Sequence, residues 1–89
     1  MNSIFRIEVL PSAERDLKHI PRPARQELIA AINSLAVNPR PFGYKPLQTK
    51  RRLFRVRAGV YRVIYAIEPE RATVVILRAG HRRSVYRNL

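Results

Sequence analysis

One stretch near the middle of the chain, residues 53–67 (LFRVRAGVYRVIYAI), constrains the fold more than any other. The apolar residues Phe54 and Val56 alternate with Arg55 and Arg57, which is the period of a strand with one buried face and one cationic face. After an Ala-Gly break, the run YRVIY begins a second segment rich in β-branched and aromatic residues. The stretch therefore predicts a β-hairpin.

The length of the hairpin connection decides on which face Arg62 lies. An even number of unpaired residues places Arg62 on the face of Arg55 and Arg57, and an odd number places it on the other face. In the even case three guanidinium groups share one patch of sheet. Like charges repel at such distances, and folding alone gives no reason to gather them, whereas a polyanionic ligand does.

Charge is distributed unevenly along the chain. Of the net charge of +12, residues 1–36 carry +1 and residues 37–89 carry +11. Such segregation is typical of proteins that bind nucleic acid, with an affinity that falls steeply with salt. A solvated basic surface and attraction to anionic lipid are the alternatives. Lipid is the weaker one, because no amphipathic helix carries the charge.

Length and composition limit the class of protein. A chain of 89 residues predicts a single domain, residues 1–89, with one modest core. The chain has no cysteine, so disulfides and thiolate metal sites are excluded. The N-terminal residues lack a signal-peptide pattern, and the longest uncharged apolar run, residues 73–77, is too short to span a bilayer. We expect a soluble cytoplasmic protein that does not associate with membranes.

Two helix patterns follow an alternating, strand-like segment at residues 4–10. Pro11-Ser12 offers a helix N-cap, and Ala13, Leu17 and Ile20 have the spacing of one buried stripe. A proline turn separates this helix from a second one, which begins near Pro23. The second helix has a longer apolar stripe, consisting of Ala24, Leu28, Ala31, Ile32 and Leu35.

Extended segments dominate the rest of the chain. Residues 44–49 are expected to be extended, and residues 73–77, which are apolar on both faces, predict an interior strand that Gly80 ends. Residues 81–87 are expected to form a short helical turn. The predicted fold is α+β, with the order β-α-α-β-β-β and two antiparallel helices packed on a mainly antiparallel four-stranded sheet.

Four phrases of the sequence resemble the RelE/ParE superfamily of toxins from bacterial and archaeal toxin–antitoxin systems. They are LPSAERDLKHIP, LAVNPRPFGYKPL, RVRAGVYRVIY and AGHRRSVYR. The resemblance extends from about Phe5 to Tyr86, and its most specific part is R-x-R-x-G-x-Y-R-x-x-Y combined with G-H-R-x-x-x-Y. It implies a small α+β toxin held inactive by a cognate acidic, RelB-like antitoxin.

The two branches of this superfamily imply different activities. Toxins of the RelE branch enter the ribosomal A site and cut the mRNA, whereas those of the ParE branch inhibit DNA gyrase. Our first hypothesis is a ribosome-dependent, metal-independent mRNA endonuclease that inhibits translation, and the second is a gyrase inhibitor without nuclease activity. A plain RNA-binding module is a third alternative. The resemblance to the RelE branch implies a catalytic set of Arg55, Arg57, Arg62, His81, Arg82 and Tyr86.

The chemistry of these side chains divides their expected roles. Arginine matches phosphate oxygens bidentately and is too basic to accept a proton, so Arg62 and Arg82 are the candidates for clamping the scissile phosphate. His81 and Tyr86 remain for proton transfer, because only histidine titrates near neutrality. A structural histidine at a strand end is an equally good interpretation of His81. For Tyr86 we favour base stacking or orientation of the nucleophile over core packing.

Further basic residues are expected to bind ribosomal or messenger RNA phosphates, with a solvated basic turn as the alternative. We interpret His19 as structural, and Tyr61 and Tyr65 as core or edge residues. The sequence has no HExxH or CxxC motif and no glycine-rich phosphate loop, so no metal or cofactor is expected. The expected RNA-binding residues are Lys45, Lys50, Arg51, Arg52 and Arg83.

Overall fold

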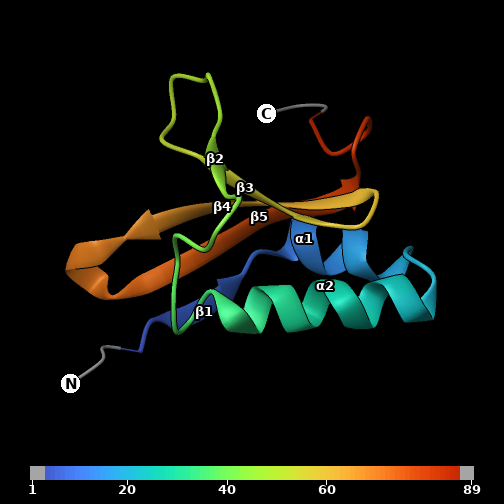
Figure 1. Ribbon diagram of the computed structural model, residues 1–89, viewed down its shortest axis with the longest axis horizontal. Helices are drawn as coiled ribbons and strands as arrows, with labels where there is room; N and C mark the ends of the chain where they lie inside the picture. The colour runs from blue at the N-terminus through green and yellow to red at the C-terminus, as the bar shows by residue number, and fades with distance from the viewer. Residues whose placement is uncertain (1–3, 87–89) are drawn as a thin grey trace.

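Strand β5 lies inside a five-stranded sheet, between the parallel strand β1 and the antiparallel strand β4 (Figure 1). The computed structural model describes residues 4–86, and the sheet order is β1-β5-β4-β3-β2. Neighbouring strands other than β1 and β5 are antiparallel. The elements are β1 (Arg6–Val9), α1 (Pro11–Lys18), α2 (Arg22–Ser34), β2 (Lys45–Pro46), β3 (Phe54–Ala58), β4 (Tyr61–Glu68), a 3-10 helix η1 (Pro69–Arg71) and β5 (Thr73–His81).

The two helices cover one face of the sheet, as predicted (Figure 1). Leu28 and Ile32 of α2 and Ala13 of α1 pack in one cluster with Val63 and Tyr65 of β4. All five side chains are at most 3% exposed, so this side of the molecule holds the main hydrophobic core. In the part of the chain that the structure describes, neither helix is long and apolar enough to cross a membrane.

The start of α1 differs from the prediction. Leu10 occupies the N-cap position without a side-chain hydrogen bond, and Pro11 begins the helix. Proline suits this position because it has no backbone N–H that would need a partner. Ser12 therefore lies inside the helix, and its hydroxyl donates a hydrogen bond to the Leu77 carbonyl of β5 (2.7 Å). The predicted cap at Ser12 is wrong, because this hydroxyl ties the helix to the sheet instead.

The β3–β4 hairpin places three arginines on one face of the sheet. Arg57 pairs directly with Arg62, and the connection consists of two residues, Gly59 and Val60. Gly59 has φ +64°, a left-handed conformation that glycine adopts without strain. The connection has an even length, and Arg55 therefore shares the face of Arg57 and Arg62.

These arginines lie on the face that the helices leave uncovered. Ile64 alternates with the core residues Val63 and Tyr65, and it packs on the opposite face of the sheet. A second, smaller apolar cluster forms there under the β2–β3 loop and the C-terminal segment. Its buried members are Leu53, Ile64, Val75, Leu77 and Val85.

Three expected details of the sheet need correction. The segment expected at residues 44–49 forms a strand only at Lys45–Pro46, and this strand adds a fifth member at the edge of the sheet. Gly80 does not end β5, which continues to His81 because Gly80 pairs with Arg62 of β4. Residues 82–86 form turns and no helix, and Arg87 lies outside the described residues.

Candidate functional site

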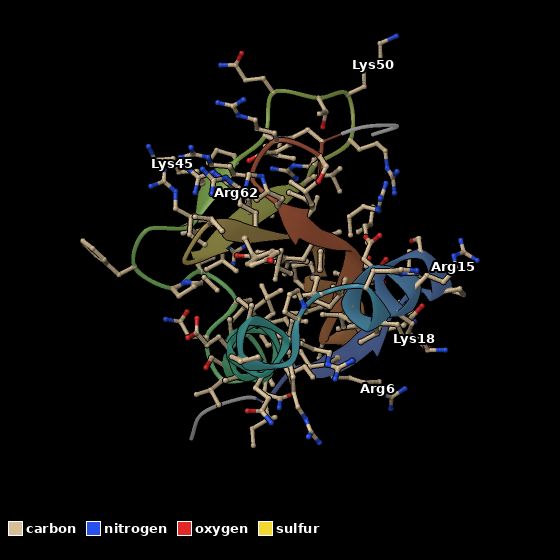
Figure 2. All side chains as sticks on the ribbon, turned by 90° about the vertical axis from the view of Figure 1, so that its right-hand side faces the viewer. Arg6, Arg15, Lys18, Lys45, Lys50 and Arg62 are labelled. Carbon is tan, nitrogen blue, oxygen red and sulfur yellow. The ribbon has the colours of Figure 1, made fainter. Side chains whose placement is uncertain are left out.

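The face of the sheet opposite the helices is the candidate site, and we name it the basic face. It consists of Arg55, Arg57 and Arg62 together with Lys45, which pairs with Arg55 across β2 and β3. Figure 2 shows Lys45 and Arg62 on the same side of the sheet, among other side-chain nitrogens and away from the helices. The β2–β3 loop and the C-terminal segment both rise from this side of the sheet (Figure 1). The fold thus gathers cations between two loops.

Like charges face one another on the basic face, and no ion pair within residues 4–86 neutralises them. Arg57 and Arg62 are direct cross-strand partners, an arrangement that destabilises a sheet when both residues have the same charge. Among residues 4–86, the ion pairs join Arg71 to Glu8 and Glu68, and Arg78 to Asp16. None of these pairs includes an arginine of the basic face. The face therefore has the electrostatics of an anion-binding surface.

Arg55 is the most buried cation of the basic face. Its side chain is only 8% exposed, although arginine is rarely buried without a partner. In the described part of the chain, its Nη1 is a buried nitrogen without a hydrogen-bond partner. An unpaired buried charged donor is costly, and an anion that accepts its hydrogen bond would remove the cost.

The C-terminal segment, residues 82–86, folds back over the basic face. Val85 is 1% exposed and belongs to the apolar cluster of this face. A Cβ at Gly80 would lie 3.8 Å from Val85 Cβ, so the segment packs closely over the end of β5. The backbone N–H of Arg82 donates to the Val60 carbonyl (2.8 Å), which continues the β4–β5 hydrogen bonding into the C-terminal segment. Tyr86 follows Val85 and is 37% exposed.

His81 lies on the other side of the sheet. It pairs with Tyr61, whereas Arg62 pairs with Gly80, and successive residues of a strand point to opposite faces. Its ring meets that of Tyr61 edge to face at 6.2 Å, and both residues line a cavity of about 290 Å³ beside Asp16 and His19 of α1. The Arg83 backbone N–H donates to His81 Nδ1 (3.4 Å). The register therefore does not bring His81 to the arginines.

The remaining predicted RNA-binding residues surround the basic face. Lys50, Arg51 and Arg52 lie in the β2–β3 loop and are exposed, and Arg83 is exposed in the C-terminal turns. The loop is closed by a hydrogen bond from the Leu47 N–H to the Leu53 carbonyl (2.8 Å). These cations extend the positive surface beyond the sheet and lack the burial that distinguishes Arg55.

Two polar contacts were not predicted from the sequence. Arg78 Nε donates to Asp16 Oδ2 (2.7 Å), and the Ala79 N–H donates to the same oxygen (3.0 Å), so this carboxylate fastens α1 to β5. This hydrogen bond raises the pKa of Arg78. The Tyr65 hydroxyl donates to the Pro39 carbonyl (2.8 Å), and burial raises the pKa of Tyr65 to about 12. No metal-ligand cluster of three or more His, Cys, Asp or Glu side chains occurs within residues 4–86.

The chain is similar to known toxins along nearly all of its length. Residues 7–86 match the family model described as the ParE toxin of the type II toxin–antitoxin system parDE. Toxin RelG of Mycobacterium tuberculosis is 35% identical over 85 residues, which cover 93% of this chain and 97% of the relative. The putative toxin RelE1 of Methanocaldococcus jannaschii is 29% identical, over 94% of this chain and 97% of the relative.

Solved structures agree with this similarity. The toxin–antitoxin complex RelBE2 of M. tuberculosis contains a chain with a TM-score of 0.77 and 32% identity, over 88% of this chain and 91% of that chain. The archaeal RelE–RelB complex of Pyrococcus horikoshii contains a chain with a TM-score of 0.78 and 23% identity, over 91% and 98%. The latter likeness concerns the fold alone. The protein therefore belongs to the RelE/ParE superfamily of type II toxin–antitoxin toxins.

Proposed function

We propose that this toxin is a ribosome-dependent, metal-independent mRNA endonuclease of the cytoplasm, which binds the scissile phosphate on the basic face. The observation that carries the proposal is the direct pairing of Arg57 with Arg62, beside the buried Arg55. Folding gains nothing from this arrangement, whereas a phosphodiester makes it favourable. The similarity to toxins named RelG and RelE1 supports the same assignment.

The arginines supply charge stabilisation in this mechanism. As the 2′-oxygen loses its proton and attacks phosphorus, the bond from phosphorus to the 5′-oxygen breaks, which leaves a 2′,3′-cyclic phosphate and, once the 5′-oxygen is protonated, a 5′-hydroxyl. Negative charge accumulates on the phosphoryl oxygens during this step, and donors already in place lower the barrier. The hairpin holds the backbones of Arg57 and Arg62 side by side, so both side chains start from fixed, adjacent positions before the RNA arrives. Arg82 follows β5, where its backbone N–H binds the Val60 carbonyl, and we assign it the role of completing the clamp from the C-terminal segment.

Tyr86 is the proposed partner of the reacting nucleotide on the same side. It is partly exposed beside Val85, which anchors the segment over the face, so its ring can stack on a base or orient the 2′-hydroxyl. His81 is less well placed. Its Nδ1 accepts a hydrogen bond from the Arg83 backbone N–H. We therefore assign phosphate clamping to the arginines, and proton acceptance by His81 requires the Arg83 N–H bond to break.

The toxin is expected to be silenced by an acidic antitoxin. Two solved structures with the same fold are complexes of RelE with RelB, from Pyrococcus horikoshii and Methanococcus jannaschii. A RelB-like partner of this chain would place carboxylates near the arginines of the basic face and apolar side chains on the fold. Because exposed charges are screened by salt, complex stability is expected to fall as ionic strength rises.

The decisive experiment measures cleavage of mRNA on programmed ribosomes by purified toxin. Arg62→Ala should reduce the cleavage rate by at least about 100-fold, the effect typical of losing one transition-state donor. The matched control is Arg6→Ala, because Arg6 lies on the opposite side of the molecule (Figure 2). Equal cleavage by wild type and Arg62→Ala would refute the proposal.

Gyrase inhibition is the second candidate, and the family model favours it because that model describes ParE toxins. The placement of His81 away from the arginines agrees with a basic face that binds without catalysing. Supercoiling assays with purified gyrase distinguish the two functions. Inhibition of supercoiling by a toxin that leaves ribosome-bound mRNA intact would establish the second function and exclude the first.

A further inference from the structure

The loop between α2 and β2 presents an aromatic side chain to solvent. Phe42 is 106% exposed, which is more than any other large hydrophobic side chain among residues 4–86. Burying such a ring is favourable by roughly 1.5–3 kcal/mol, so folding alone would place it in a core. The exposed ring is therefore available for contact with a ligand.

The loop that carries Phe42 is fixed to the sheet. The Tyr65 hydroxyl binds the Pro39 carbonyl (2.8 Å), and the Tyr44 N–H donates to the Pro41 carbonyl (3.0 Å). The Tyr44 ring packs on Phe54 at 5.6 Å, and Phe54 packs on Tyr65 at 5.9 Å. The loop is therefore anchored at both ends of the turn, and Phe42 projects from a constrained backbone.

A cationic cavity lies next to Phe42. Its volume is about 260 Å³, below the roughly 300–1,000 Å³ of pockets for drug-sized ligands, so it suits a group no larger than one nucleotide. It includes Arg55, whose buried Nη1 has no hydrogen-bond partner. The lining residues are Phe42, Gly43, Lys45, Arg55, Val56 and Arg57.

We propose that this cavity is a nucleotide subsite, in which a phosphate of the RNA binds Arg55 and the attached base stacks on Phe42. The inference rests on the proposed nuclease function and adds a second contact, beside the phosphate clamp of Arg62. Aromatic rings next to cationic grooves bind single-stranded nucleic acid in this way, because every base has a stacking face. Three of the six residues that line the cavity beside Phe42 are cations, which favours a partner that brings a phosphate together with a stacking group.

Phe42→Trp makes this subsite directly observable, because the chain contains no other tryptophan. The purified variant is titrated at low salt with a single-stranded tetraribonucleotide and, separately, with ribose 5-phosphate, which has the phosphate but no base. Quenching of tryptophan fluorescence by the tetranucleotide and not by ribose 5-phosphate is the expected result. No response to the tetranucleotide, or the same response to both, would overturn the subsite.

Affinity measurements on substituted proteins give a second test. Phe42→Ala should weaken tetranucleotide binding by about 5- to 150-fold, the effect of losing one base–aromatic stack, and Phe42→Tyr should restore it. Val37→Ala is the control, because Val37 is also exposed (62%) and does not line the cavity. Equal losses in Phe42→Ala and Val37→Ala would contradict a role in stacking.

Two further arms separate this inference from the nuclease proposal. In Phe42→Trp/Arg62→Ala, loss of mRNA cleavage with retained quenching by RNA supports both assignments independently. If the toxin cleaves mRNA but RNA does not quench the fluorescence of Phe42→Trp, the nuclease function stands and the subsite is refuted. A shift of tryptophan emission by an acidic amphipathic peptide, with no response to RNA, would assign Phe42 to the antitoxin and refute the proposal.

Discussion

The two faces of the sheet differ in how their side chains are packed and paired. On the helix-covered face, large apolar side chains are buried, and the polar groups that reach it are paired, as in the hydrogen bond from Tyr65 to Pro39. On the basic face, Arg57 and Arg62 are opposed, and Arg55 is buried with an unpaired nitrogen. The first arrangement stabilises the protein without any ligand. The second is unfavourable in the free protein and becomes favourable when an anion binds.

The unfavourable arrangement of the arginines marks the basic face as the functional one. Natural proteins break the rules of favourable packing and pairing mainly where a site requires it. In this protein the opposed arginines and the unpaired nitrogen of Arg55 all lie on the basic face, whereas the helix-covered face is packed with buried apolar side chains. Substitutions on the two faces should therefore change different properties, stability on one and ligand binding on the other.

The largest expected effect on stability belongs to the helix-covered face. Leu28 is fully buried in the core, and Leu28→Ala should lower the free energy of unfolding by about 2–5 kcal/mol through lost burial and a cavity. Chemical denaturation measures the change. Ile29→Ala is the matched control on the same helix, since Ile29 is 42% exposed, and it should change stability by less than about 0.5 kcal/mol. Equal losses would mean that α2 does not pack as described.

A smaller effect is expected at Tyr65. Tyr65→Phe leaves the Pro39 carbonyl without its donor and should cost about 1–3 kcal/mol in chemical denaturation. The pKa of Tyr65 is about 12 in the folded protein and 10 ordinarily, so the unfolded chain loses its proton first as the pH rises. The stabilisation is therefore complete below pH 10 and is lost between about pH 10 and 12.

The control for this pH dependence is the variant itself. Other groups, including lysines, also titrate above pH 10, and they affect wild type and Tyr65→Phe alike. The difference in unfolding free energy between the two proteins isolates the phenol. A difference that stayed constant from pH 9 to pH 12 would contradict the assignment of the raised pKa to burial.

Much of the fold could be predicted because its signals are local. The alternation of Phe54 and Val56 with the arginines of β3, and the helical spacing of Leu28 and Ile32, follow from periods of 2 and 3.6 residues. The helix start was missed because Ser12 finds its acceptor in β5, 65 residues away in sequence. Strand β2 was missed as a sheet member because its two residues are too few to form a pattern.

The candidate site was partly predictable for the same reason. The shared face of Arg55, Arg57 and Arg62 depends on the hairpin length alone, and the even alternative is the one found. The burial of Arg55 depends on neighbours that include Lys45 of β2, and the placement of His81 depends on strand pairing as far as the end of β5. Such long-range information is absent from any local pattern. The roles of these side chains in cleavage remain predictions.

On the basic face the expected effect on stability is smaller and has the opposite sign. Arg55→Met removes a buried, unpaired guanidinium nitrogen and keeps much of the side-chain volume. Apolar replacement of buried charge is often neutral or stabilising, so the free energy of unfolding should stay constant or rise by about 1 kcal/mol. Thermal denaturation measures stability, and RNA affinity should fall in the same protein. A destabilised Arg55→Met would show that Arg55 holds the fold together.

The smallest expected effect is on the salt dependence of RNA binding, without a change in stability. Arg57 is exposed and has no carboxylate partner within the described chain, so Arg57→Gln should leave stability within about 0.5 kcal/mol of wild type. Each phosphate contact contributes about 0.7 to the slope of log affinity against log salt for a single strand. The slope for RNA binding should therefore decrease by about 0.7 in Arg57→Gln and stay unchanged in Arg6→Gln. If both variants gave the same slope, total charge alone would control binding, and the basic face would lose its distinction from the rest of the surface.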